Sequence, residues 1–227
     1  GLLSPRDVTN LVRLLGARGA HASMLRALRA LTLAPGDLLG ASIDPASLAR
    51  AQRGAASAVF GYTAAVASLS SSPNPEVRNS APPLLDEMDR RGVTPSTYTF
   101  TALLLGVQTA GEAVGVLDRA RAYEGPVEVD VHLYNAAVHA CARDSTNSGW
   151  QTALALLRTM RRDGVQPDGR TYGSLMHACA RAGQARVALS LLDEMKARGS
   201  DLAGGIDAKA WGAALRACAK VGDYERA

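Results

Sequence analysis

Apolar residues recur at helical spacing in two alternating kinds of segment along most of the chain. The first kind occurs at 133–141, where positions i, i+1, i+4, i+5 and i+8 are Leu133, Tyr134, Ala137, Val138 and Cys141. The second kind has apolar residues at i, i+4 and i+7, as in Ala153, Leu157 and Met160. Both spacings place these residues on one face of a helix, so each segment is predicted to be an amphipathic helix.

Polar and turn-forming residues separate these predicted helices. The stretch DSTNSG at 144–149 follows the first helix, and DGVQPD at 163–168 follows the second. Gly164 favours the end of a helix, and Pro167 cannot continue one. Residues 131–168 therefore form a predicted pair of antiparallel helices.

The same pair recurs along the chain. Three first helices have nearly the same sequence: LYNAAVHACAR at 133–143, TYGSLMHACAR at 171–181 and AWGAALRACAK at 210–220. The second-helix spacing also recurs, in Met24, Leu28 and Leu31; Ala81, Leu85 and Met88; Ala113, Leu117 and Ala120; and Ala188, Leu192 and Met195. Tyr134, Tyr172 and Trp211 are 38 and then 39 residues apart, an interval typical of a solenoid. The predicted fold class is all-α.

The phase of the repeat divides the chain into six predicted parts. The first, 1–57, is a degenerate helical repeat with an insertion, and the others are repeats at 58–96, 97–130, 131–168 and 169–207 with a truncated copy at 208–227. Two interpretations of SLARAQRGAAS at 47–57 stay open, an extra helix or a degenerate half-repeat. The stretch at 70–83 is predicted to be an exposed loop that leads into a proline-containing helix start. The chain is expected to be a fragment of a longer solenoid.

Composition and charge narrow the possible partners. The chain is 47% hydrophobic but only 4% aromatic, so its core must consist mainly of Ala, Leu, Val and Met. No apolar run approaches the roughly 20 residues of a membrane-spanning helix. The net charge is +4, and all of this excess lies in residues 131–227. Such an excess fits a nucleic-acid partner without requiring one.

The recurring HACAR sequence invites a metal-site interpretation, because His139 and His177 each precede a cysteine by two residues. Residues i and i+2 of a helix point about 200° apart, so they do not share an ion. The cysteines are predicted to be buried structural residues. Phosphate-binding glycine loops and hydrolase motifs are missing from the sequence. Neither a metal, a cofactor nor enzymatic activity is expected, and the acidic pairs 86–87 and 193–194 are expected on the solvated surface.

These motifs, in this order, resemble the pentatricopeptide repeat. The resemblance rests on HLYNAAVHACAR, ALALLRTMRRDGVQPD, RTYGSLMHACARAG, VALSLLDEMKARG and LLDEMDRRGVTPS, and it extends over residues 59–227. The tetratricopeptide repeat is the closest alternative, but its W-x2-L-G-x2-Y pattern is missing. The resemblance implies a right-handed α–α superhelix whose first helices line a concave surface for single-stranded RNA.

The resemblance also implies which residues contact bases. In that family the fifth residue of the first helix and the last residue of the repeat recognise about one base together, through its exposed edge. The implied pairs are Asn135 with Asp168 for uracil, Thr101 with Asp130 for guanine, and Thr63 with Ser96 for a base left undecided. For each of these residues the alternative is a helix-cap or turn role.

Other positions depart from the family pattern. Gly173 and Gly212 occupy the fifth position and have no side chain for a base edge. The second position, usually small and aliphatic, holds residues that can stack on bases or meet phosphates: Phe60, Tyr98, His132, Arg170 and Lys209. Binding of RNA backbone or of structured RNA therefore stays open beside recognition of one base per repeat.

Three functions follow from these expectations. The first is a non-catalytic RNA-binding protein that stabilises, processes or helps translate an organellar transcript. The second is a structural subunit of an organellar ribosome or another large assembly, in contact with ribosomal RNA and protein. The third is a protein-binding scaffold. The compartment, chloroplast or mitochondrion, is implied by the resemblance alone.

Overall fold

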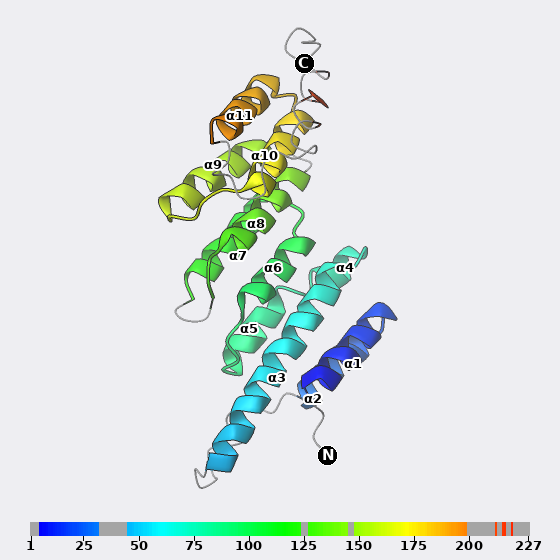
Figure 1. Ribbon diagram of the computed structural model, residues 1–227. Helices are drawn as coiled ribbons and strands as arrows, with labels where there is room; N and C mark the ends of the chain where they lie inside the picture. Colours follow the sequence, from blue (N-terminus) through cyan, green and yellow to red (C-terminus); the bar gives the residue numbers. More distant parts are fainter. Residues whose placement is uncertain are drawn as a thin grey trace. The chain divides into compact units, whose positions relative to one another are not determined.

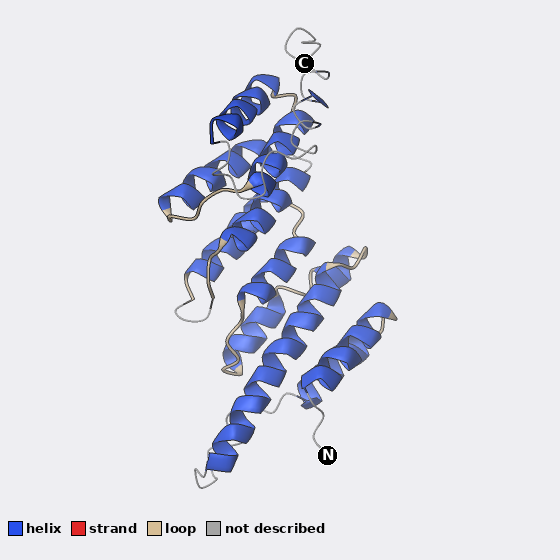
Figure 2. Ribbon diagram, in the orientation of Figure 1, coloured by secondary structure: helices blue, strands red, loops and turns tan. Residues whose placement is uncertain are grey.

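The computed structural model is all helix and loop over the residues that it describes, which Figure 2 shows in blue and tan. These residues are 5–31, 45–123, 127–144, 148–198, 212, 215, 216 and 219. The chain divides into two compact units. Unit 1 is Gly1–Gly106 with Tyr123–Glu128, and unit 2 is Val107–Ala122 with Val129–Ala227. Each unit is described by itself.

The other helices of unit 1 pack on one long helix. Its helices are α1 (Pro5–Ala17), α2 (His21–Leu31), α3 (Pro45–Ser70), α4 (Pro75–Arg78), α5 (Pro83–Arg90) and α6 (Thr97–Gly106). Helix α3 packs against α1, α2, α4, α5 and α6, and Figure 1 shows it as the long cyan helix. The first helices α3 and α6 therefore lie side by side.

Unit 2 repeats one packing arrangement. Its helices are α7 (Ala110–Arg121), α8 (Val131–Arg143), α9 (Gly149–Arg162), α10 (Gly169–Arg181) and α11 (Ala185–Arg198). Helix α8 packs on α9, the second helix of its own pair, and on α10, the next first helix, while α10 packs on α11 (Figure 1). This arrangement of helix pairs confirms the predicted all-α solenoid class.

The core consists of the residues that the periodicity selects. All members of the predicted apolar sets whose burial is described are buried: Met24, Leu28, Ala81, Leu85, Met88, Ala113, Leu117, Ala120, Leu133, Tyr134, Ala137, Val138, Cys141, Ala153, Leu157, Met160, Ala188, Leu192 and Met195. Burial raises the pKa of the Cys141 thiol to about 12 and that of Cys179 to about 11. Both cysteines are free and buried, as predicted.

The segment at 47–57 is part of the long helix α3. The helix runs from Pro45 to Ser70 without a break, so it contains both this segment and the first helix of the next predicted repeat. The sequence between these ends is rich in alanine and has no proline, which favours one continuous helix. The predicted loop at 70–83 contains the short helix α4, which Asn74 caps through Glu76 N.

Glycines close or tighten several turns. Gly92 and Gly164 follow the second helices α5 and α9 and have φ of 64° and 76°, values that disfavour a side chain. Gly149 begins α9 so close to α8 that an added Cβ would lie 2.5 Å from Cys141 O. The predicted helix stop at Gly164 is therefore confirmed.

Two glycine-to-alanine changes in unit 2 are expected to have opposite effects. Gly164→Ala places a side chain at positive φ and should lower the free energy of unfolding by about 1 kcal/mol. Gly173→Ala lies within α10, where an added Cβ meets nothing within 4 Å, and should raise it by up to about 1 kcal/mol. Urea denaturation of the two variants measures both changes, and changes of the same sign would contradict these assignments.

Candidate nucleic-acid interface

The fifth residue of α8 is bonded to the start of α10. Asn135 Nδ2 donates to both carboxylate oxygens of Asp168, at 3.0 and 3.1 Å. Its Oδ1 accepts from the Thr171 hydroxyl at 2.6 Å, and that hydroxyl lies 3.0 Å from Asp168 Oδ1. We call Asn135, Asp168 and Thr171 the junction network. It brings together the two residues of the predicted uracil pair.

The same carboxylate starts α10. Asp168 is the N-cap of this helix and accepts from Thr171 N at 2.8 Å, while the Thr171 hydroxyl accepts from Asp168 N at 3.1 Å. These two bonds form a capping box. Asp168 therefore has the helix-cap role that was the alternative, and it contacts Asn135 as well.

Unit 1 contains a related set of contacts 72 residues earlier. The hydroxyls of Thr63 and Thr99 are 2.8 Å apart, and Ser96 Oγ lies 3.2 Å from Thr99 Oγ1. Ser96 N also donates to Thr99 Oγ1 at 3.2 Å. Thr63, Ser96 and Thr99 thus correspond to Asn135, Asp168 and Thr171, with hydroxyls in place of the amide and the carboxylate.

The predicted guanine pair has different surroundings. Thr101, in unit 1, donates from its hydroxyl to Thr97 O of its own helix at 2.9 Å. Asp130, in unit 2, caps α8 by accepting from Leu133 N at 2.9 Å. Leu133 occupies the position of Thr99 and Thr171 but has no hydroxyl. The pairing of Thr101 with Asp130 at a guanine stays a prediction.

Exposed side chains occupy the described second positions. Phe60 on α3 is 59% exposed and Tyr98 on α6 is 78% exposed, on two helices that pack together. His132 on α8 and Arg170 on α10 are exposed in the same way. None of the four contributes to the core. Lys209 lies outside the described residues.

The Asn135 amide keeps part of its hydrogen-bonding capacity. A side-chain amide has two N–H donors and two acceptor lone pairs. Asp168 and Thr171 account for one of each, which leaves one donor and one acceptor on a side chain that is only partly buried. The amide can therefore bind a ligand edge that offers an acceptor next to a donor.

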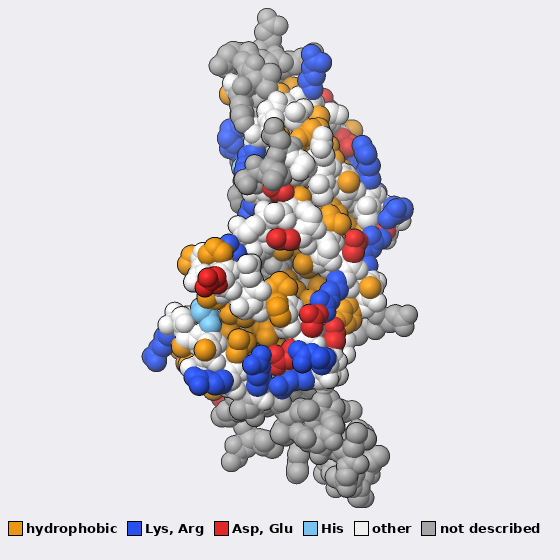
Figure 3. Space-filling view, turned by 180° about the vertical axis from the view of Figure 1, so that it is seen from behind, with side chains coloured by type: hydrophobic (Ala, Val, Ile, Leu, Met, Phe, Trp, Pro, Cys, Tyr) orange, Lys and Arg blue, Asp and Glu red, His pale blue; other side chains and the backbone are white. Residues whose placement is uncertain are grey.

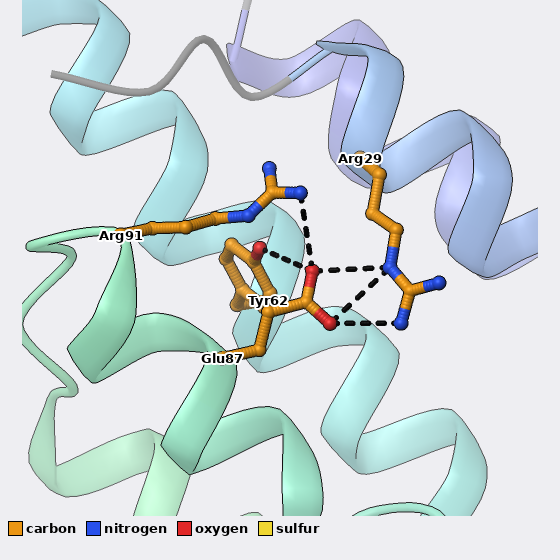
Figure 4. Close-up of polar contacts among 4 residues, drawn as sticks. All are labelled: Arg29, Tyr62, Glu87 and Arg91. Carbon is orange, nitrogen blue, oxygen red and sulfur yellow. Dashed lines mark hydrogen bonds and ion pairs between the residues drawn. The ribbon is translucent and has the colours of Figure 1, made fainter. Parts of the chain in front are cut away.

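A second set of polar contacts joins first helices to second helices. Each contact involves the tyrosine that directly precedes a fifth-position residue. In unit 1, Glu87 on α5 accepts from Tyr62 OH at 3.1 Å and from Arg29 Nη2 at 2.9 Å, and it pairs with Arg91 at 3.4 Å (Figure 4). The expectation that Glu87 lies on the solvated surface was wrong, because Glu87 is buried. Its neighbour Asp86 is exposed, as expected.

Unit 2 contains this tyrosine–carboxylate–arginine set twice. Tyr134 OH donates to Asp163 at 2.5 Å, and Arg121 pairs with the same carboxylate at 2.7 Å. Tyr172 OH donates to Glu194 at 2.9 Å, and Arg161 pairs with the same carboxylate. Figure 3 shows acidic and basic side chains lying next to each other on one face, in keeping with such pairing.

Three buried tyrosines directly precede fifth-position residues. Tyr62, Tyr134 and Tyr172 are fully buried, and each directly precedes a fifth-position residue, Thr63, Asn135 or Gly173. Burial raises the pKa of Tyr134 and Tyr172, so these hydroxyls stay protonated as donors. The sets hold the backbone of each first helix against the second helices.

Sequence reasoning missed Thr99 and Thr171, although a local signal was present. A Ser or Asp followed three residues later by Thr is close to the capping-box pattern, and it occurs at Ser96 and Asp168. It also missed the buried role of Glu87. That role depends on Arg29, which lies 58 residues away in the sequence.

The recurring His and Cys residues lie apart. His139 and His177 are exposed, whereas Cys141 and Cys179 are buried. Within the described ranges, no three His, Cys, Asp or Glu residues are grouped so that they could hold a metal ion. Among the helices that the structure describes, none has the length and apolar character needed to cross a membrane.

The fold and the repeated junction define an α-helical repeat protein. The sequence profile of the pentatricopeptide repeat domain matches residues 83–119 and 155–200. The match of this profile to two segments of the chain confirms the resemblance seen in its motifs. No curated protein sequence matches it significantly.

Two solved structures are similar in fold. The first is a variant of pentatricopeptide repeat protein PPR10 in complex with an 18-nt psaJ RNA element, at a TM-score of 0.68 and 20% identity. The second is PPR10 from maize, at a TM-score of 0.62 and 18% identity. The matches cover 96% and 97% of this chain but only 28% and 32% of those chains. The chain thus spans about a third of their length.

The buried carboxylate of unit 1 gives a pH-dependent contribution to stability. Burial by itself would raise the pKa of Glu87, but the hydrogen bonds from Arg29 and Tyr62 and the charges of Arg29 and Arg91 outweigh it and lower that pKa below its ordinary 4.5. A lowered carboxyl pKa stabilises the fold above the ordinary pKa, and the contribution is lost as pH falls through the lowered value.

Glu87→Gln should therefore destabilise unit 1 at pH 7 by roughly 1–2 kcal/mol, since the half-exposed Arg29 is largely screened by solvent. The difference from the unchanged protein should shrink as pH falls from 4.5 through the lowered pKa of Glu87, where the folded protein takes up the proton. Urea denaturation at several pH values measures this difference in the free energy of unfolding. Asp86→Asn, a change at the exposed neighbouring carboxylate, is the control. An equal effect of the control, or a difference that persists at low pH, would contradict the assignment.

Proposed function

We propose that this chain is a non-catalytic RNA-binding protein whose first-helix faces bind single-stranded RNA. The observation that carries the proposal is the junction network, in which Asp168 and Thr171 orient the partly exposed amide of Asn135. The RNA complex of a protein with a similar fold supports it. An organellar transcript is the proposed target, and its stabilisation, processing or translation is the proposed role.

Asp168 fixes which way the Asn135 amide points. An ionised carboxylate only accepts hydrogen bonds, so the NH2 group must face it. The second N–H and the remaining lone pair of Oδ1 then lie on the outward edge. Uracil offers a carbonyl acceptor beside its N3–H donor, which complements this edge. The proposed contact at this repeat is therefore a uracil held by two hydrogen bonds.

The second-position side chains supply stacking and charge around each base. Phe60 and Tyr98 offer exposed rings in unit 1, and His132 and Arg170 offer a ring and a guanidinium in unit 2. Stacking of a base on such a group contributes about 1–3 kcal/mol with little sequence preference. Thr63 with Ser96, and Thr101 with Asp130, are the further base-contact proposals, and Lys209 is the further phosphate proposal.

A second candidate function is a structural subunit of an organellar ribosome or similar assembly. Gly173 favours it, because this fifth position has no side chain and an added Cβ would meet nothing within 4 Å. Such a position suits contact with RNA backbone or folded RNA more than selection of a base. Recovery of the full-length protein in ribosomal particles, rather than with free transcripts, would favour this function.

A single substitution tests base recognition. We expect the unchanged chain to select uracil at one position when it is incubated with a pool of random single-stranded RNAs and the bound RNAs are sequenced. Asn135→Thr copies the fifth residue that the family associates with guanine when Asp ends the repeat, so it should change that one preference from uracil to guanine.

The matched control is Gly173→Ala, which changes the fifth position of the next repeat without adding a hydrogen-bonding group. It should leave the selected sequence unaltered. An identical preference in the unchanged chain and Asn135→Thr would contradict the assignment of Asn135. Absence of RNA binding at low salt would contradict the proposed function itself.

A further inference from the structure

Three hydroxyl groups of unit 1 form a chain of hydrogen bonds at the start of α6. The buried Thr99 Oγ1 lies 2.8 Å from Thr63 Oγ1 and 3.2 Å from Ser96 Oγ. It also accepts from Ser96 N at 3.2 Å. We call Thr63, Ser96 and Thr99 the hydroxyl cluster. It occupies the positions that the junction network has in unit 2.

The bonds of Thr99 allow two arrangements of the protons. A hydroxyl has one O–H donor and two acceptor lone pairs. Ser96 N uses one lone pair of Thr99 Oγ1, which leaves one donor and one lone pair for the hydroxyls of Thr63 and Ser96. Thr99 therefore donates to one of these two hydroxyls and accepts from the other.

The direction of this chain decides what the partly exposed Thr63 offers to a ligand. When Thr99 donates to Thr63, the Thr63 O–H points outward as a donor. When Thr63 donates to Thr99, Thr63 offers only acceptor lone pairs outward. Both arrangements contain the same bonds between the same groups, so their free energies are similar.

A carboxylate removes this choice in unit 2. Asp168 occupies the position of Ser96 and, when it is ionised, only accepts hydrogen bonds. The NH2 group of Asn135 therefore faces it, at 3.0 and 3.1 Å from its two oxygens. The last residue of the repeat thus fixes the outward polarity in unit 2, whereas the hydroxyl of Ser96 leaves it open in unit 1.

We propose that the hydroxyl cluster makes the repeat at 58–96 a permissive base-binding site, in which Thr99 relays the polarity of residue 96 to Thr63. This inference rests on the proposed function, because the ligand is a base of the same RNA strand. The Thr63 hydroxyl contacts the ring nitrogen in the middle of the base-pairing edge, which is an acceptor in adenine and cytosine and an N–H donor in guanine and uracil. The cluster adapts to either kind, so all four bases bind about equally well.

The substitution Ser96→Asp should impose one direction on the chain of hydroxyls. The carboxylate only accepts, so Thr99 donates to it and must accept from Thr63. Thr63 then offers only lone pairs outward, which complement the N–H of guanine and uracil. Aspartate is also a preferred residue at a helix start, so the change is compatible with α6.

The experiment repeats the selection from random single-stranded RNAs with the unchanged chain and with Ser96→Asp. The variant should select guanine or uracil at one further position, where the unchanged chain selects no base. Four RNAs that differ only at this position are then compared. The unchanged chain should bind them within about twofold of one another, whereas the variant should bind the guanine and uracil RNAs about fivefold more tightly than the other two, the effect of one hydrogen bond.

Ser96→Asn is the matched control, because its side chain has the shape of aspartate but contains both donors and an acceptor. It leaves the direction open and should give no shared preference for guanine and uracil. The double variant Ser96→Asp/Thr99→Val lacks the relaying hydroxyl and should lose the new preference. The uracil preference at Asn135 should persist in every variant, which shows that each still folds and binds RNA.

Two results would overturn the permissive site while the uracil preference at Asn135 persists. One is a single preferred base at this position in the unchanged chain, and the other is the absence of a further selected position in Ser96→Asp. A new preference that persists in the double variant would overturn the relay through Thr99. Failure of the unchanged chain to bind any RNA of the pool at low salt would instead contradict the proposed function.

Discussion

The hydrogen bond between Asp168 and Asn135 is the interaction on which the account depends. Asp168 accepts a hydrogen bond from Thr171 N in the first turn of α10, so its position is fixed by the start of that helix. The same carboxylate orients the amide of the preceding first helix. The cap therefore links the packing of two neighbouring repeats to the direction in which the proposed base-contacting group, the Asn135 amide, points.

The tyrosine–carboxylate–arginine sets also hold the first helices in place, by bonding them to the second helices. A first helix that slid or turned would displace its fifth residue, and the buried tyrosine directly before that residue resists this movement. In unit 1, Tyr62 is held through Glu87, which also receives hydrogen bonds from Arg29 of α2. Specific side-chain contacts thus position the surface, in addition to the apolar core.

The helices, their buried faces and the cysteine environment could be predicted from the sequence, because they follow from local periodicity. The location of Asp168 next to Asn135 followed only from family resemblance. The burial of Glu87 could not be predicted from local periodicity. The continuity of α3 was missed, although its alanine-rich and proline-free sequence favours a single helix. Glu87 is buried because of a partner 58 residues away, and nothing in its own segment separates it from the exposed Asp86. Thr171 was missed because its hydroxyl acts between two repeats.

The most direct test of the account is the uracil preference of Thr171→Val, which removes the hydroxyl that contacts Asn135 and keeps the shape of the side chain. The ratio of affinities for RNAs with and without uracil at the contacted position should fall by about fivefold, the effect of a bond of about 1 kcal/mol. Thr99→Val, in unit 1, should leave that ratio unaltered. An unchanged ratio in Thr171→Val, with RNA still bound, would contradict the claim that the junction network orients the base-contacting amide.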